Sequence, residues 1–228
     1  MTAPLTLHYA PDNASLCVRL ALEELGLPYR TVLVDRAAQG QKAPAFLALN
    51  PNGLIPVLET AQGPVFETGA ILLWLADTHP ALFPGPHDPA RAHALQWLVW
   101  LANTLHATER MLFYPDHYIA GDPDGLRAGA RRRLTAQLDL LDAAAHADWL
   151  DADDTSAQGC YLGPLLRWPA LYGGPSDWYD LAHWPRLMAF ARRFEQRPAA
   201  QRAAMAEGLG PTPFSVPIPC NPPEGSAI

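Results

Sequence analysis

The sequence is poor in cysteine, and its cysteines form no recognisable motif. Cys17, Cys160 and Cys220 lie far apart, so the chain has no C-x-x-C pair. An odd number of distant cysteines is also a poor framework for disulfide bonds. We therefore expect a protein of the reducing cytoplasm that lacks the paired thiols of a redox protein.

Positive charge is scarce as well. The chain has 16 Lys and Arg against 23 Asp and Glu, which gives a net charge of −7. This balance argues against nucleic acid or an anionic membrane as the main partner. No apolar run approaches the roughly 20 residues that span a bilayer. The first residues, 1–4, do not combine a basic region with an apolar stretch, so we expect no secretory signal.

The first third of the chain alternates strand and helix patterns. With 228 residues, of which 49% are hydrophobic, the chain can bury a substantial core. The order of elements is βαβ followed by ββα, which predicts a small α/β domain with a mixed sheet over residues 1–79. We expect strands over 5–9, 31–34, 56–60 and 64–66, and helices over 15–25, 46–49 and 67–77.

After this region the pattern changes to helices alone. Residues 80–88 are rich in proline and read as a linker. Residues 89–208 are predicted to form an all-helical domain. Its expected helices cover 89–113, 124–145, 156–171, 186–196 and 198–208. The proline-rich tail over 209–228 has no periodicity, so we expect it to be extended or disordered.

One short stretch combines an apolar run with a proline. Leu54-Ile55-Pro56-Val57-Leu58 reads as a strand entered through a proline, which has no N–H for the strand ladder. A cis Ile55-Pro56 bond would turn the N–H and C=O of Ile55 outward, where they can pair with an extended peptide. Glu67-Thr68 opens the next predicted helix, whose free N–H groups can hold a carboxylate. Together these features suggest a small acidic peptide as the ligand.

At this point the sequence resembles the cytosolic glutathione S-transferases, and within them the bacterial beta class. The resemblance reaches to about residue 207 and is carried by five stretches in order, over 50–58, 66–71, 97–106, 161–168 and 197–202. It implies a thioredoxin-like first domain, an all-helical second domain and a homodimer. It also implies an enzyme that joins glutathione to small apolar electrophiles, which is a detoxification chemistry.

Such an enzyme has to convert a thiol into a thiolate, which is the nucleophile. A thiol with a pKa near 8.5 is only about 3% ionised at pH 7, and lowering that pKa by roughly two units raises the thiolate to about three quarters. A hydroxyl donor at a helix N-terminus can supply this stabilisation. Ser15 has the hydroxyl and the position, and Tyr9, at the end of the first strand, is the alternative donor. Asn13 is a further side chain that could reach the sulfur.

The resemblance assigns the remaining site residues. Glu67 and Thr68 would receive the γ-glutamyl end of glutathione, Ile55 and Pro56 would pair with its backbone, and Lys42 or Gln41 would meet its glycyl carboxylate. His106 matches an active-site histidine of the beta class. Tyr114 and Trp168 are candidates for the second-substrate pocket. We expect no metal site.

The sequence departs from the family pattern at several positions. Ala14 stands where beta-class members carry a cysteine that forms mixed disulfides with glutathione, so this thiol chemistry is unavailable. Val99 and Ala107 replace a polar residue and a lysine, which weakens any role of the partner subunit. Gly159 replaces the aspartate of a Ser/Thr-x-x-Asp capping box that opens with Ser156.

Three further functions compete with the transferase. The fold also hosts glutathione-dependent dehalogenases, isomerases and lyases. A non-enzymatic glutathione-binding protein would be expected to lose the hydroxyl near the thiol, whereas Ser15 and Tyr9 are both present. A thioredoxin-like redox protein is disfavoured by Ala14 and by the missing C-x-x-C pair.

Overall fold

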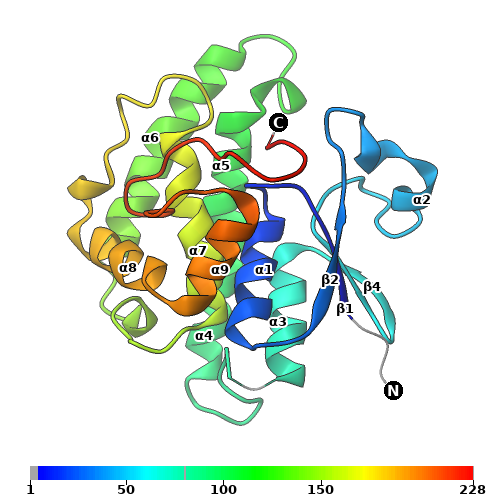
Figure 1. Ribbon diagram of the computed structural model, residues 1–228. Helices are drawn as coiled ribbons and strands as arrows, with labels where there is room; N and C mark the ends of the chain where they lie inside the picture. Colours follow the sequence, from blue (N-terminus) through cyan, green and yellow to red (C-terminus); the bar gives the residue numbers. More distant parts are fainter. Residues whose placement is uncertain (1–4, 80, 228) are drawn as a thin grey trace.

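A four-stranded mixed sheet forms one side of the molecule (Figure 1). The structure is a computed structural model that describes residues 5–79 and 81–227. The strands are β1 (Leu5–Tyr9), β2 (Tyr29–Leu33), β3 (Val57–Thr60) and β4 (Gly63–Phe66), in the order β2-β1-β3-β4. β1 pairs parallel with β2 and antiparallel with β3, and β3 and β4 form a hairpin. The predicted βαβ-ββα unit with its mixed sheet is confirmed.

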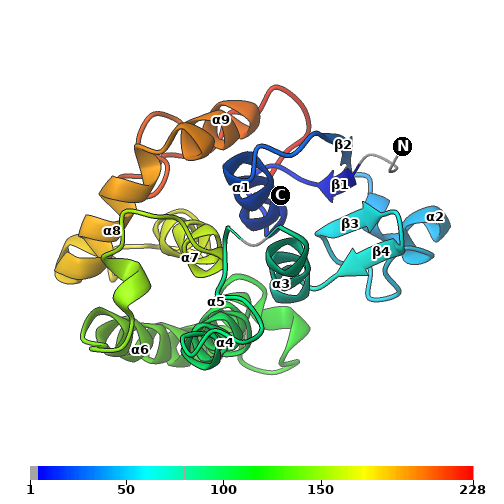
Figure 2. The ribbon, with the colours of Figure 1, turned by 90° about the horizontal axis from the view of Figure 1, so that it is seen from below.

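Helices cover both faces of this sheet. α1 (Ser15–Glu24) and α3 (Thr68–Thr78) lie on the face turned toward the rest of the molecule, whereas α2 (Pro44–Leu47) lies on the opposite face (Figure 2). A short 3₁₀ turn, η1 (Gly40–Lys42), precedes α2. The first eight residues of α1 are all buried, because this helix is enclosed by the sheet on one side and by α7 and α9 on the other.

The rest of the chain is helical, as predicted. Its helices are α4 (Arg91–Trp100), α5 (His106–Phe113), α6 (Pro123–Asp142), α7 (Ala157–Arg167), α8 (Pro185–Glu195) and α9 (Pro198–Glu207). Short 3₁₀ turns connect them: η3 (Pro115–His117), η4 (Asp148–Leu150), η5 (Trp168–Ala170) and η6 (Leu181–His183). Three of the helices begin with a proline, which suits the first turn because its N–H has no helical partner there. No helix within residues 5–79 and 81–227 has the length and apolar character needed to cross a membrane.

Some boundaries differ from the prediction. The single helix expected over 89–113 is interrupted by a π-helical segment, η2 (Leu101–Leu105), which leads directly into His106. β2 begins at Tyr29, two residues before the predicted strand. The helix expected over 156–171 ends at Arg167 and continues as η5, where Pro169 has no N–H for a further α-helical bond.

The hydrophobic core runs without a break through both predicted domains. Leu16 and Leu20 of α1 belong to the same buried cluster as Leu105 and Leu162 of the helical part. Residues 81–90, between α3 and α4, contain no helix or strand. The division into residues 1–79, a linker over 80–88 and residues 89–208 remains a prediction about chain organisation.

The proline-rich tail, predicted to be extended or disordered, is packed against the molecule without forming a helix or strand over residues 209–227. Gly208 ends α9 with a positive φ of 63°, and the tail then crosses the surface toward the start of α1 (Figure 1). Phe214 is fully buried, and the Glu195 carboxylate accepts hydrogen bonds from the backbone and hydroxyl of Ser215. The tail has no helix or strand, but its final residues reach the cavity described next.

Candidate functional site

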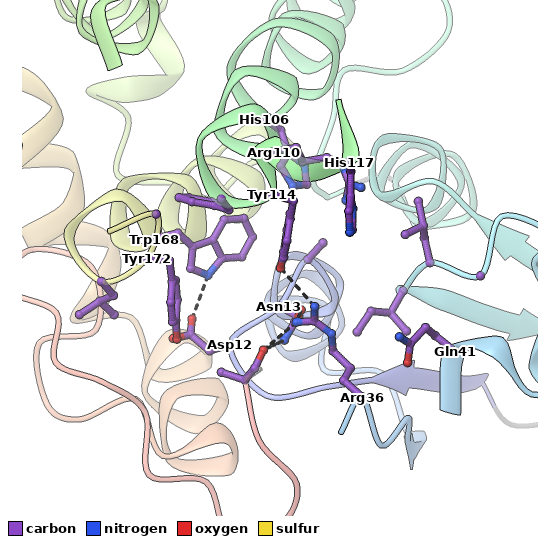
Figure 3. Close-up of a pocket in the computed structure, with 18 of the residues that line it drawn as sticks. Asp12, Asn13, Arg36, Gln41, His106, Arg110, Tyr114, His117, Trp168 and Tyr172 are labelled. Carbon is purple, nitrogen blue, oxygen red and sulfur yellow. Dashed lines mark hydrogen bonds between the residues drawn. The ribbon is translucent and has the colours of Figure 1, made fainter. Parts of the chain in front are cut away.

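A cavity of about 410 Å³ opens between one end of the sheet and the helical part (Figure 3). Six parts of the chain line it: the β1–α1 loop, the segment around η1, the segment before β3, the region from α5 to η3, the region of η5, and the tail. The volume and the mixed polar and aromatic walls suit a small organic ligand.

Seven of the predicted site residues line this cavity. They are Asn13, Gln41, Lys42, Ile55, His106, Tyr114 and Trp168. The structure thereby brings the predicted glutathione residues of the first domain to the same cavity as the predicted second-substrate residues of the helical part.

Pro56, Glu67 and Thr68 lie beside the cavity and do not line it. Val57 and Phe66 are paired across β3 and β4. Pro56 directly precedes Val57 and Glu67 directly follows Phe66, so both lie at the same end of the hairpin, next to Ile55. The Ile55-Pro56 bond is cis, as expected.

The start of α3 has the features of a carboxylate site. Glu67 precedes the helix with a φ of 70°, a conformation that non-glycine residues rarely adopt and that concentrates at functional sites. The first turn contains no acidic side chain, so its N–H groups meet no internal carboxylate there. Such a helix start favours an external anion.

The two predicted thiol donors point to other partners. The Ser15 hydroxyl is fully buried and donates to the Ala10 carbonyl at 3.1 Å. The Tyr9 hydroxyl donates to the Glu224 carboxylate of the tail. Burial, followed by this carboxylate, raises the pKa of Tyr9 well above its usual range. Neither side chain lines the cavity in this conformation, whereas Asn13 does.

His106 faces the cavity as a neutral ring. Burial and, to a smaller extent, the nearby charge of Arg110 together lower its pKa to about 4. Its Nδ1 lies 3.0 Å from the Tyr161 hydroxyl, and its ring contacts Trp168 with a centroid distance of 5.6 Å. Burial raises the pKa of Tyr161, and a hydrogen bond with Thr68 partly opposes this rise. Tyr161 therefore links His106 to the start of α3.

Asp12 is the centre of a buried network that the sequence did not reveal. Its carboxylate accepts two hydrogen bonds from Arg167, at 2.8 and 2.9 Å, and one from the Tyr172 hydroxyl at 2.5 Å. It also accepts one from Trp168 Nε1 at 2.9 Å (Figure 3). Its backbone N–H donates to Glu207 of α9. The network fixes the β1–α1 loop against the cavity wall; the only local signal for it was a polar Asp-Asn turn.

Three cationic or titratable side chains of the cavity were also missed. Arg36, Arg110 and His117 come from loops and helix ends without a recognisable motif. The tail adds the Ala227 carbonyl, which accepts hydrogen bonds from Asn13 Nδ2 at 3.0 Å and from Arg36 at 2.7 Å. Within the described residues, no group of three or more His, Cys, Asp or Glu side chains is arranged to hold a metal ion.

Comparison with known proteins identifies relatives along nearly the whole chain. The family described as "Glutathione S-transferase, N-terminal domain" matches residues 14–78. The chain is similar to the glutathione S-transferase GST-4.5 of Xanthomonas campestris, with 32% identity over 89% of this chain and 98% of that protein. It is also similar to a maleylacetoacetate isomerase of Rhizobium meliloti, with 34% identity over 86% of this chain and 92% of that protein.

Solved structures give the same result. A sphingomonad glutathione S-transferase, complexed with glutathione, superposes with a TM-score of 0.74 and 32% identity, covering 90% of this chain and all of that chain. A bacterial beta-class glutathione S-transferase of Sphingomonas chungbukensis superposes with a TM-score of 0.74 and 31% identity, covering 89% of this chain and 98% of that chain.

Proposed function

Because this chain belongs to the glutathione S-transferase family and resembles its beta class, we propose that it binds glutathione and transfers it to small electrophiles. The observation that carries this proposal is a shared site. Ile55 and Lys42 line the cavity, the start of α3 lies beside them, and aromatic side chains form the opposite wall. A peptide and a second, apolar substrate can therefore meet there.

Glutathione would lie along the end of the sheet. The backbone of Ile55 has no hydrogen-bond partner within the described chain and can pair with the cysteinyl unit of the tripeptide. Glu67 would hold the γ-glutamyl ammonium, while Thr68 and the first N–H groups of α3 would hold the adjacent carboxylate. Lys42 would meet the glycyl carboxylate.

This placement brings the thiol toward the N-terminus of α1. The thiol gives its proton to water, and the thiolate attacks the electrophilic carbon. With an aryl halide the C–S bond forms and the C–halogen bond breaks, and the halide leaves with the bonding electrons. The helix start stabilises the thiolate and lowers the pKa of the thiol.

Three side chains are candidates for the hydrogen bond to the thiolate. Ser15 and Tyr9 have to turn their hydroxyls away from Ala10 and Glu224. Asn13 already directs its Nδ2 to an oxygen that lines the cavity, the Ala227 carbonyl. A comparison of Asn13→Ala, Ser15→Ala and Tyr9→Phe separates them, because loss of the true donor raises the pKa of the bound thiol.

Calorimetric titration with glutathione and an assay with 1-chloro-2,4-dinitrobenzene test the function. We expect binding in the micromolar to millimolar range and steady consumption of both substrates. Absence of binding at millimolar glutathione would refute the proposal. Binding without conversion of any electrophile would favour a non-enzymatic glutathione-binding protein.

A glutathione-dependent isomerase is the second candidate, favoured by the 34% identity with the Rhizobium meliloti isomerase. An isomerase forms a C–S bond and breaks it again, so glutathione is not consumed. Measuring free thiol during turnover therefore distinguishes the two activities.

The homodimer and the cytoplasmic location belong to the same proposal. The family resemblance carries the proposal of a homodimer, because a singly exposed apolar side chain such as Val99 of α4 is ordinary on a protein surface. All three cysteines are free, which suits a reducing compartment. Sedimentation analysis tests the dimer, for which a monomer at micromolar concentration would be the contrary result.

A further inference from the structure

The outer wall of the cavity carries two arginines without acidic partners. Arg36 and Arg110 lie on either side of Tyr114, and each guanidinium carbon is 5.8 Å from the centre of that ring. Arg36 donates to the Tyr114 hydroxyl at 3.3 Å, and Arg110 donates to the Tyr118 hydroxyl at 3.2 Å. Neither arginine takes part in an ion pair within residues 5–79 and 81–227.

The acid at this cavity does not neutralise them. Asp12 is the one carboxylate among the described lining residues, and its oxygens already accept four hydrogen bonds, two of them from the buried Arg167. Among the described residues, no carboxylate therefore compensates the positive charge of Arg36 and Arg110, in a protein whose net charge is −7. Unpaired guanidinium groups in a pocket are suited to carboxylates, which they bind through paired N–H donors.

The structure also shows an oxygen in this position. Ala227 of the tail lines the cavity, and its carbonyl accepts hydrogen bonds from Arg36 at 2.7 Å and from Asn13 Nδ2 at 3.0 Å. A substrate carboxylate can take the place of this carbonyl. Phe113, Tyr114 and Tyr172 also line the cavity and offer it aromatic surfaces, and Phe113 packs edge-on against both tyrosines.

From this arrangement we infer that the second substrate is an electrophile that carries a carboxylate on a flat, unsaturated or aromatic body. The carboxylate binds to Arg36 and Arg110, the body stacks among the aromatic side chains, and the electrophilic carbon faces the thiolate. This inference rests on the proposed function and specifies its substrate class.

A pair of unreactive probes tests the inference by binding alone. 3,5-Dinitrobenzoate and 1,3-dinitrobenzene differ by the carboxylate, and quenching of tryptophan fluorescence reports their binding because Trp168 lines the cavity. One hydrogen-bonded charge pair corresponds to a preference of about tenfold for the carboxylate. We expect Arg110→Gln and Arg36→Gln each to reduce this preference, and Arg110→Lys to retain part of it.

Arg133→Gln is the matched control, because Arg133 is an exposed arginine of α6 that does not line the cavity. It should leave the preference unchanged, and circular dichroism verifies that each variant is folded. Equal affinity for the two probes, or a preference that survives in both cavity variants, would overturn the inference.

The reactive counterparts separate this inference from the proposed function. Glutathione conjugation of 4-chloro-3,5-dinitrobenzoate and of 1-chloro-2,4-dinitrobenzene is compared, each relative to its uncatalysed rate. Conversion of both with no advantage for the benzoate refutes the inference and leaves the transferase function intact. Conversion of neither refutes the transferase function, whereas the probe titration still decides whether the cavity selects carboxylates.

Discussion

Gly159 occupies the third position of α7, where the family pattern has an aspartate. Ser156 caps this helix, and its hydroxyl oxygen accepts from the Gly159 N–H at 3.0 Å. One half of a capping box is therefore present, and the carboxylate that would reach back to the Ser156 N–H is missing. We predict that Gly159→Asp completes the box and stabilises the protein.

The structure has room for the new side chain. A Cβ at Gly159 would lie 3.5 Å from Ser156 Oγ and 3.6 Å from Phe190, which are ordinary contacts. Gly159 also borders a second cavity of about 380 Å³, whose walls carry both arginines and aspartates, so the cap rather than the cavity charge is expected to stabilise the new carboxylate. A cap and a favourable helix-terminal charge contribute about 1 kcal/mol together.

Gly159→Asn is the matched control, since it has the shape of aspartate without the charge. For a chain of this length, 1 kcal/mol corresponds to a rise of about 2–4 °C in the melting temperature of Gly159→Asp over the parent protein, and Gly159→Asn should gain only the part that does not depend on charge. Calorimetry and urea unfolding measure it. A melting temperature of Gly159→Asp equal to or below that of the parent protein or of Gly159→Asn would refute the reasoning.

Three further predictions concern the site. Asp12→Ala leaves the buried guanidinium of Arg167 without its carboxylate, which should lower the free energy of unfolding by about 3–5 kcal/mol. Calorimetry should then show a fall in melting temperature of about 10 °C. A fall below about 3 °C would contradict a structural role for this pair. The pKa of His106 is about 4 in the folded protein, and an unfolded histidine titrates near 6.5, so the folded state favours the neutral ring. The stability that the neutral ring contributes is fully present above pH 6.5 and is lost as the pH falls toward 4. His106→Gln should therefore make the free energy of unfolding, measured with urea, depend less on pH between 6.5 and 4. An unchanged pH dependence would argue against this role. Glu224→Gln removes the carboxylate that accepts from Tyr9, so ultraviolet titration should show a lower pKa for this phenol, and an unaltered titration would mean that burial alone sets it.

Local patterns in the sequence were sufficient for the fold, and the family resemblance supplied the candidate site residues. The strand and helix order, the run around Pro56 and the helix start at Glu67 depend on neighbouring residues, so the chain displays them directly. Ile55 reaches the cavity because it lies just before β3, which pairs with β4 over a short stretch of chain, whereas Lys42 reaches it from η1.

Tertiary structure alone decided which side chains face the cavity. Asp12 and Arg167 are 155 positions apart, and Tyr9 and Glu224 are 215 apart, so no local pattern connects them. The direction of a hydroxyl such as that of Ser15 depends on which acceptor the folded chain brings nearby. The tail likewise carried no periodicity. Burial of Phe214 nevertheless anchors it to the molecule, and its final described residue, Ala227, lines the cavity.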